Sequence, residues 1–273
     1  MVCNDIFLVV TDVDGTLIKE SSPINSVVIP QLNLDAAKEI VARNLLTIAT
    51  GRSCITSRAI CEKLPTNLPA ILYNGSCIYD YKEERLLFSV CQPQSAIDVL
   101  RQVMEKYDDC GVLMANLKGE FVVRNDRFLS AYSRNLGVTI EPTVLADCSG
   151  MLKALVSCDM AKQDEVYEFM CGVMDNELSL TRSEKCFIEI LPSAVSKGAA
   201  LVKLLELIDL PLANVFAIGD YYNDVSMLEL VGCPIAVASA PECVKSICKH
   251  VVSNAEDGSL MDVWEILKNS KRS

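Results

Sequence analysis

The chain has 273 residues, of which 51% are hydrophobic, and a formal net charge of −11 at pH 7. This length is sufficient for one large domain or two modest ones, each with its own hydrophobic core. The negative charge argues against nonspecific binding to nucleic acid or anionic membranes, and no apolar run is long enough to span a bilayer. We therefore expect a cytoplasmic monomer or weak homodimer with no nucleic-acid or membrane partner.

Thirteen cysteines are scattered along the chain, and no two of them have Cys-x-x-Cys spacing. The only histidine, His250, leaves no second imidazole for a zinc or haem site. The apolar run near the N-terminus is short and is interrupted by acidic residues, so it does not predict a signal peptide. We interpret the cysteines as reduced, mostly buried thiols of an intracellular protein.

Strand-like and helix-like segments alternate in the first quarter of the chain and again in its last third. The first series has strands at residues 7–10, 45–50 and 70–73 and helices at 33–44 and 53–64. The second has helices at 198–210 and 260–267 and strands at 215–218 and 235–238. This alternation predicts an α/β core with a doubly wound, Rossmann-like parallel sheet covered by helices.

The chain between residues 80 and 190 has a different pattern. Helices and short strands follow one another there in the order α-β-β-α-β-α-β-β, which is typical of an α+β module. We therefore predict a core domain formed by residues 1–79 and 191–273, with residues 80–190 inserted into it as an α+β domain.

Two carboxylates, Asp12 and Asp14, directly follow the first apolar strand, in the stretch FLVVTDVDGTLI at residues 7–18. Residues two apart on an extended strand point to the same side, so the two negative charges converge. Like charges this close raise each other's cost of ionisation. The pattern therefore requires a positive partner, either a bound cation or a basic side chain from elsewhere in the chain.

Other small and polar residues follow core strands or open a core helix. Ligands of doubly wound sheets bind beyond the carboxyl ends of the strands, so these positions are candidate site residues. They are Thr50, Gly51, Arg52, Lys197, Gly198, Gly219, Asp220, Asn223 and Asp224. Carboxylate oxygens suit Mg²⁺, whereas hydroxyls, cationic side chains and backbone N–H groups suit phosphate. We expect a site for a divalent cation and a phosphate group.

Four short motifs occur in order at these positions: DVDGTL at residues 12–17, ATGR at 49–52, SKG at 196–198 and GDYYND at 219–224. Their order and spacing resemble the four signatures of the haloacid dehalogenase superfamily. The flanking sequences, NGSCIYD from residue 74 and IEILPSAVSKGAAL from residue 188, resemble its Cof-type subfamily of phosphatases. The resemblance covers both ends of the chain and implies that the insert is the family's α/β cap domain.

The resemblance also implies a role for each motif residue. Asp12 matches the nucleophile that forms an aspartyl-phosphate, and Asp14 matches the general acid and base. Mg²⁺ would be held by the Asp12 side chain, the Asp14 backbone carbonyl and Asp220. Asp224 would serve the metal's outer shell or hold Lys197 in place. The expected phosphate-binding groups are the backbone N–H groups of Val13 and Gly51 and the side chains of Thr50, Lys197 and Asn223.

Three hypotheses on function follow. The leading one is a Mg²⁺-dependent phosphatase that hydrolyses a small phosphorylated metabolite, such as a sugar phosphate, through an aspartyl-phosphate. A phosphosugar mutase of the phosphomannomutase type is an alternative, because those enzymes share DVDGTL and a similar cap. A non-catalytic sensor of phosphate ligands is the third hypothesis, although binding alone does not require a nucleophile.

Several further residues are open to two interpretations. Arg52 is either a surface arginine or a substrate contact. The Asn-Gly pair at residues 74–75 is a turn signal first, with a functional role as the alternative. In the insert, Arg124 and Glu189 are candidate substrate contacts or solvated strand residues. The stretch DGS at 257–259, where relatives often carry Gly-Val, indicates a packing change.

Overall fold

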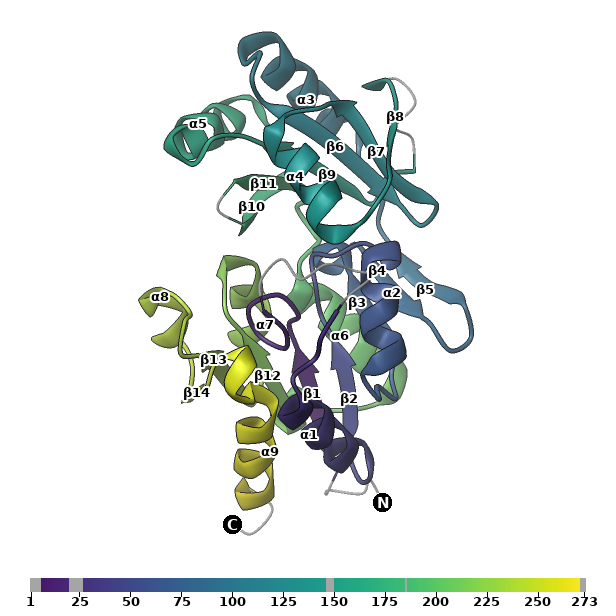
Figure 1. The fold of residues 1–273 in the computed structure, drawn as a ribbon, viewed down its shortest axis with the longest axis vertical. Coiled ribbons are helices and arrows are strands. Elements are labelled where there is room, and N and C mark those ends of the chain that lie inside the picture. The colour runs from purple at the N-terminus through teal and green to yellow at the C-terminus, as the bar shows by residue number, and fades with distance from the viewer. Residues whose placement is uncertain (1–5, 20–26, 146–149, 185, 271–273) are drawn as a thin grey trace.

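The computed structural model describes residues 6–19, 27–145, 150–184 and 186–270. Its lower part in Figure 1 is built on a five-stranded parallel sheet with the strand order β14-β13-β12-β1-β2. These strands are β1 (Leu8–Thr11), β2 (Leu45–Ile48), β12 (Val215–Gly219), β13 (Cys233–Val237) and β14 (His250–Val252). β1 lies in the middle, in parallel register with both β2 and β12. The predicted parallel core sheet is confirmed.

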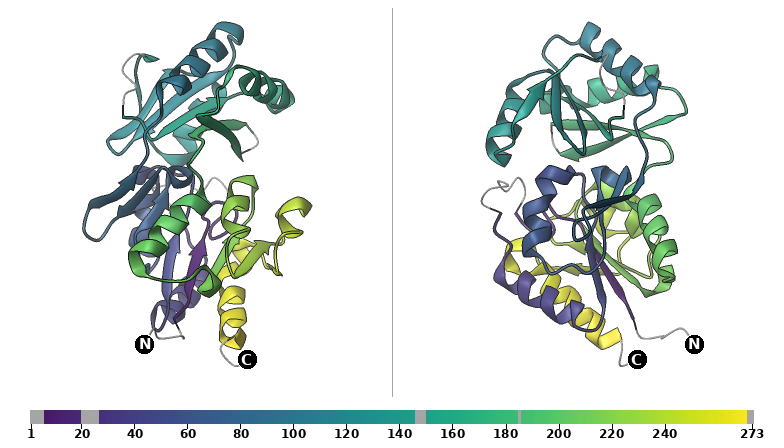
Figure 2. Two further views of the ribbon diagram at one scale, coloured as in Figure 1. Left: turned by 180° about the vertical axis from the view of Figure 1, so that it is seen from behind. Right: turned by 90° about the vertical axis from the view of Figure 1, so that its right-hand side faces the viewer.

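Helices cover both faces of this sheet, as the right-hand view of Figure 2 shows. On one face α1 (Gln31–Val41) packs against α9 (Ser259–Ser270), and α6 (Lys197–Ile208) lies on the other. The remaining helices of this part are α2 (Cys54–Lys63), α7 (Val225–Leu228) and α8 (Glu242–Lys245). Because both faces are covered, consecutive side chains of β1 are buried without alternation. This arrangement confirms the predicted doubly wound α/β core.

A small antiparallel sheet continues from the β2 edge through an isolated bridge between Ala49 and Ile71. Its strands are β3 (Ala70–Leu72), β4 (Cys77–Asp80) and β5 (Arg85–Ser89). A single 3-10 turn, Tyr73–Gly75, joins β3 to β4, and Asn74 has a φ of 54° within it. The Asn-Gly pair therefore does form the turn that its sequence indicates.

The upper part of the molecule is built on a six-stranded sheet with the order β10-β11-β9-β6-β7-β8, antiparallel except between β7 and β8. The strands are β6 (Gly111–Asn116), β7 (Gly119–Arg124), β8 (Ile140–Pro142), β9 (Lys153–Ser157), β10 (Leu178–Glu184) and β11 (Phe187–Pro192). α3 (Gln94–Lys106) and α5 (Gln163–Val173) cover the face turned away from the lower part. α4 (Arg127–Leu136) lies on the opposite face, toward the lower part (Figure 1).

The chain crosses between the two parts within a few residues. The N–H of Val90 donates to the carbonyl of Ser76 in the lower part, whereas that of Gln92 donates to the carbonyl of Met151 in the upper part. The return crossing lies between Ser193, which bonds to the carbonyl of Glu177, and the start of α6. The division at residues 79 and 191 stays a prediction. Because β5 pairs with β4, we propose Cys91 as the first boundary in place of residue 79.

Four short strands, β4, β5, β8 and β14, were not predicted from the sequence. β8 and β14 have only three residues each. β5 reads Arg-Leu-Leu-Phe-Ser and is largely exposed, so it shows neither alternation nor a buried run. Strands of this kind form because a neighbouring strand offers hydrogen bonds. The hydrophobic pattern of the sequence does not reveal such pairing.

All cysteines within the described ranges are free thiols. Only four of them, Cys54, Cys77, Cys110 and Cys158, are buried, which is fewer than expected from the sequence. No helix in the same ranges combines the length and the apolar character needed to cross a membrane.

The side chain of Asn33 joins three distant segments of the core. Its Nδ2 donates to the carbonyl of Leu17 at 2.9 Å and to that of Ala255 at 3.0 Å, and its Oδ1 accepts from the N–H of Leu260 at 2.9 Å. Asn33 is fully buried, so no water can replace these bonds. The loop after β1 is thereby fixed to the start of the C-terminal helix.

The stretch at residues 257–259 completes the same junction. Gly258 has a φ of +96°, a conformation that other residues rarely adopt. The hydroxyl of the next residue, Ser259, donates to the carbonyl of Thr16 at 2.6 Å. This stretch therefore packs against the DVDGTL loop. The packing change relative to relatives stays a prediction.

Asn33→Ala should destabilise the fold by about 2 to 4 kcal/mol, because it leaves two carbonyls and one N–H buried without partners. Gln31→Ala is the matched control, since Gln31 is exposed on the same helix and bonds only to the Asp35 side chain in the described contacts. Urea unfolding followed by circular dichroism measures both variants. Equal free energies of unfolding for Asn33→Ala and the wild type would contradict the role of this junction.

Candidate active site

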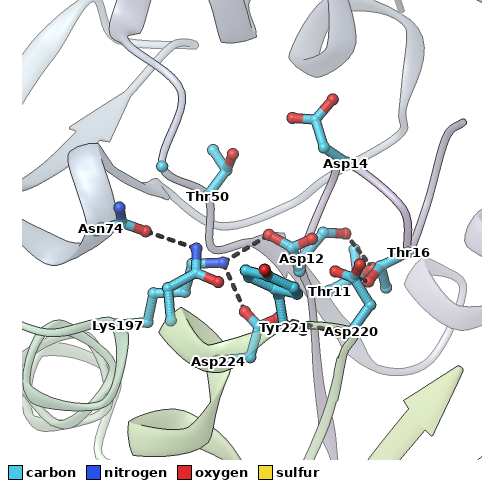
Figure 3. Close-up of polar contacts among 12 residues, drawn as sticks. Thr11, Asp12, Asp14, Thr16, Thr50, Asn74, Lys197, Asp220, Tyr221 and Asp224 are labelled. Atoms are coloured by element: carbon cyan, nitrogen blue, oxygen red, sulfur yellow. Dashed lines mark hydrogen bonds and ion pairs between the residues drawn. The ribbon is translucent and has the colours of Figure 1, made fainter. Parts of the chain in front are cut away.

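The carboxyl ends of β1 and β12 lie side by side and bring two aspartates together. The N–H of Asp12 continues the ladder by donating to the carbonyl of Ile218 at 2.9 Å. Asp220 follows β12 directly, and its Oδ1 accepts from the hydroxyl of Thr16 at 3.1 Å. Figure 3 shows both carboxylates on the same side of the sheet edge.

Lys197 reaches this pair from the first turn of α6. Its ammonium group donates to Asp12 and to Asp224, each at 2.6 Å, and the lysine is fully buried. Although burial alone would lower the pKa of Lys197, the charges of Asp12 and Asp224 raise it. Lys197 therefore stays protonated at the site (Figure 3).

Asp224 has two structural contacts besides Lys197. Its Oδ2 accepts from the N–H groups of Asp220 at 2.9 Å and of Tyr221 at 3.1 Å, which closes the turn after β12. Two roles were expected for Asp224, in the metal's outer shell or in holding Lys197 in place. Its contacts favour the second.

The acidic cluster carries more negative charge than Lys197 balances. Asp12, Asp220 and Asp224 each offer one oxygen, and these three atoms lie within 4.8 Å of one another. Burial raises the pKa of Asp12 to about 7 and, helped by the charge of Asp12, raises that of Asp220 to about 9. A hard divalent cation would relieve this repulsion, so the donor set fits one.

Gly15 lets the DVDGTL loop approach this cluster. A Cβ at Gly15 would lie 2.4 Å from Oδ2 of Asp220, and its φ of +83° is itself unfavourable for other residues.

Asp14 lies apart from the cluster, and its side chain points away from Asp12 (Figure 3). Its two carboxylate oxygens accept from Nε and Nη2 of Arg52, both at 2.6 Å. Arg52 is only 7% exposed and also donates to the carbonyl of Thr56 at 3.3 Å, so the surface interpretation of Arg52 is wrong. Only the backbone carbonyl of Asp14, the atom expected from the sequence, remains available to a cation in the cluster.

The expected phosphate-binding residues surround the same edge. Thr50 and Gly51 line the cavity above Asp12, together with Asn223. The side chain of Val13 is buried in the core, so only its backbone can serve the site. The Asn223 amide is oriented by Asn74, whose Oδ1 accepts from Asn223 Nδ2 at 3.0 Å.

Two charged residues of the upper part reach down to these loops. Glu189 on β11 accepts from Asn74 Nδ2 at 2.8 Å and pairs with Lys153 on β9 at 3.1 Å. Lys153 also donates to the carbonyl of Gly51 at 3.0 Å. Glu189 was a candidate substrate contact in the sequence analysis. The side chain of Asn74 bonds to Glu189 and to Asn223, in addition to the turn that its backbone forms. Lys153 was missed, although a lone lysine in the apolar strand MLKALVS was a usable signal.

The site opens into a cavity of about 640 Å³ between the two parts of the molecule. Its floor includes Asp12, Asp14 and Asp220, and its upper wall comes from the inserted segment. The wall residues, none of which was predicted apart from Glu189, include Phe128, Ala131, Tyr132, Asn135, Leu136, Lys153, Cys186, Phe187 and Glu189. Arg124 does not line this cavity, because its guanidinium donates to the carbonyls of Met104, Tyr107 and Cys110.

Known proteins resemble this chain along nearly its whole length. A family model described as haloacid dehalogenase-like hydrolase matches residues 9–263. The chain is 30% identical over 285 residues to a 5-amino-6-(5-phospho-D-ribitylamino)uracil phosphatase of Bacillus subtilis (strain 168), covering 94% of this chain and 96% of that protein. It is 26% identical over 269 residues to a pyridoxal phosphate phosphatase of Escherichia coli (strain K12), covering 93% and 95%.

Solved structures agree on the fold. A haloacid dehalogenase-like hydrolase from Bacteroides thetaiotaomicron has a TM-score of 0.82 at 23% identity, covering 96% of this chain and 99% of that one. The relatives named here are phosphatases, which favours an enzyme over the non-catalytic sensor considered from the sequence. The chain belongs to the haloacid dehalogenase-like hydrolases, in their Cof-type phosphatase branch, and is a phosphoric monoester hydrolase.

Proposed function

We propose that this chain hydrolyses a small phosphorylated metabolite in a Mg²⁺-dependent reaction, through an aspartyl-phosphate formed on Asp12. The observation that carries the proposal is the position of the Asp12 carboxylate. It lies on the floor of the cavity, 2.6 Å from the buried ammonium group of Lys197 and beside Asp220 and Asp224.

Asp12 is the proposed nucleophile. Its Oδ1 is bonded to Lys197, and we assign Oδ2 to the attack on phosphorus. The attack forms the bond between Oδ2 and phosphorus and breaks the bond between phosphorus and the ester oxygen, which leaves with the electron pair. Repulsion between the Asp12 carboxylate and the anionic phosphate group is the main electrostatic obstacle in phosphoryl transfer. The positive charge of Lys197 reduces this repulsion.

The donor set around Asp12 suits Mg²⁺, because three carboxylates face one ammonium group. Asp12 and Asp220 would hold the ion through their side chains and Asp14 through its backbone carbonyl. When bound, Mg²⁺ supplies charge neutralisation for the carboxylate and the phosphate group.

Asp14 is the proposed general acid and base. In its protonated form it gives its proton to the departing alkoxide, and the carboxylate that results takes a proton from the water that attacks the aspartyl-phosphate. This attack forms a bond between the water oxygen and phosphorus and breaks the bond between phosphorus and Oδ2 of Asp12, whose carboxylate takes back the electron pair. Arg52 holds both oxygens of Asp14, so one of these two bonds must open as the leaving-group oxygen approaches. Arg52 is therefore a positioning residue in this proposal.

The phosphate oxygens would be held by the groups that line the cavity floor. These are the N–H groups of Val13 and Gly51, the Thr50 hydroxyl, Lys197 and the Asn223 amide. Asn223 is already aimed by its bond to Asn74.

The proposed substrate class is a small phosphorylated metabolite. The phosphatases described above act on small phosphorylated metabolites according to their names, which supports the same class here. A sugar phosphate stays a prediction. A phosphomannomutase-type reaction stays the alternative, and it is separated by assaying phosphate release from hexose 1- and 6-phosphates against their interconversion.

Chelation of divalent cations should abolish phosphate release, and added Mg²⁺ should restore it. Asp220→Asn should raise the Mg²⁺ concentration for half-maximal activity at least about tenfold, because it removes a charged ligand. Asp108→Asn, which changes an exposed carboxylate outside the cavity lining, should leave this concentration unaltered. Titration of activity with Mg²⁺ measures all three proteins. Full activity in excess chelator would refute the metal requirement, and an unaltered Asp220→Asn titration would remove Asp220 from the site.

The two aspartates should differ on substitution. Asp12→Asn should abolish turnover of every substrate, because an amide cannot attack phosphorus. Asp14→Asn should slow an alkyl phosphate about 10²- to 10⁴-fold, and the first step of an aryl phosphate less, because an aryl leaving group needs no proton. Asp14→Asn also lacks the base that activates the attacking water. Phosphate transferred from the aryl substrate should therefore accumulate on the enzyme.

A rapid-quench burst with labelled substrate on Asp14→Asn, followed by peptide mapping, tests this division of labour. The expected label lies on Asp12. Label on another residue would overturn the assignment of the nucleophile. Equal losses for alkyl and aryl substrates with no trapped intermediate would overturn that of the acid and base.

A further inference from the structure

Two cysteines of the inserted part lie opposite each other at the ends of neighbouring strands. Gly111 of β6 pairs with Ser157 of β9 in antiparallel register, so the next pair along this ladder is Cys110 and Cys158. Both side chains belong to the apolar cluster between the sheet and the helices α3 and α5. The two thiols therefore share one face of the sheet.

The backbones of the two cysteines form hydrogen bonds away from each other. The N–H of Cys158 donates to the carbonyl of Cys186, on the β11 side, at 3.0 Å. The carbonyl of Cys110 accepts from Nε of Arg124, on the β7 side, at 2.6 Å. Cys110 and Cys158 are therefore a non-hydrogen-bonded pair, in which Cα atoms are about 4.5 Å apart and side chains are closest. A disulfide spans Cα atoms that are roughly 4.4 to 6.8 Å apart, so the register suits one.

The surroundings make the two thiols unequal. The thiol of Cys158 donates a hydrogen bond to Cys110, and this bond, together with the positive charge of Arg124, lowers the pKa of the Cys110 thiol. The same contact and burial raise the pKa of Cys158. Arg124 is held beside Cys110 because its guanidinium also donates to the carbonyls of Met104 and Tyr107. Cys110 is therefore the thiol that ionises more readily, and Cys158 is its protonated neighbour.

We propose that Cys110 and Cys158 are a redox-active thiol pair, which a peroxide oxidises to a reversible disulfide between β6 and β9. Neither cysteine is among the residues that line the catalytic cavity. The pair is therefore a site of its own, and the proposal does not depend on the phosphatase reaction.

The oxidation takes place in two steps. The thiolate of Cys110 attacks one oxygen of hydrogen peroxide, which forms an S–O bond and breaks the O–O bond. The other oxygen leaves as hydroxide with the electron pair and becomes water by taking up a proton, equivalent to the one that the Cys110 thiol lost. The sulfur of Cys158 then attacks the sulfenic acid on Cys110, which forms the S–S bond and breaks the S–O bond. The departing hydroxide takes the proton of the Cys158 thiol and becomes a second water.

The pair lies at the strand ends, next to the surface of the molecule. Each cysteine is only 1% exposed, but Cys110 follows the exposed residues Asp108 and Asp109 directly. Met160, two residues after Cys158, is 61% exposed. Opening of the strand ends is therefore enough to admit a small oxidant such as hydrogen peroxide, without unfolding of the sheet.

Peptide mapping of the oxidised wild-type protein tests the proposal. The protein is treated with hydrogen peroxide, its remaining thiols are alkylated, and it is digested without reduction for mass spectrometry. We expect a disulfide-linked peptide pair that contains Cys110 and Cys158 and is lost after dithiothreitol. Cys171→Ser is the matched control and should give the same pair, because Cys171 is an exposed thiol on α5.

Cys158→Ala separates the roles of the two thiols. This variant lacks the sulfur that attacks the sulfenic acid, so the sulfenic acid should persist on Cys110 and react with dimedone. Cys110→Ala should leave Cys158 without dimedone, because the nucleophile is then absent.

Recovery of Cys110 and Cys158 as alkylated thiols from wild-type protein in a large excess of peroxide would overturn the proposal. A disulfide that joins Cys158 to Cys186 instead would also overturn it. Dimedone on Cys158 in Cys110→Ala, with none on Cys110 in Cys158→Ala, would overturn the assignment of the nucleophile. The wild-type map decides on the pair even where an alanine variant fails to fold.

Discussion

The burial of a charged lysine is the constraint on which the site depends. An isolated ammonium group costs several kcal/mol to remove from water, so Lys197 requires carboxylates at hydrogen-bond distance. Asp12 and Asp224 meet this need. Asp12 directly follows β1, and Asp224 lies in the 3-10 turn that follows the neighbouring strand β12. Because α6 must deliver Lys197 to the same point, the register of two strands and one helix determines where the nucleophile lies.

The inserted segment forms hydrogen bonds to loops of the core and contributes the upper wall of the cavity. Lys153 and Glu189 bond to Gly51 and Asn74, residues of the loops expected to hold the phosphate group. Glu120 accepts hydrogen bonds from Tyr132 of the cavity wall and from Ser53, the residue after Arg52. The loops that follow the core strands and the wall of the cavity are therefore joined by direct hydrogen bonds.

The sequence predicted the parallel core and the residues at strand ends, because a residue that follows a buried strand is positioned by that strand alone. Asp12 and Asp220 are of this kind. The pairing of Asp14 with Arg52 joins residues 38 positions apart and depends on how a loop folds, which periodicity does not reveal. Lys153 and Tyr132 were missed because their contacts with the site depend on how the insert packs against the core.

The central claim is that Asp12, aligned by Lys197, accepts the phosphoryl group. Beryllofluoride binds to carboxylates as a stable mimic of an aspartyl-phosphate, so ¹⁹F NMR of the protein with beryllofluoride and Mg²⁺ tests the claim without turnover. The account predicts a bound resonance for the wild type that requires Mg²⁺ and is absent from Asp12→Asn. A bound resonance that persists in Asp12→Asn, or its absence from a wild-type enzyme that releases phosphate, would contradict it.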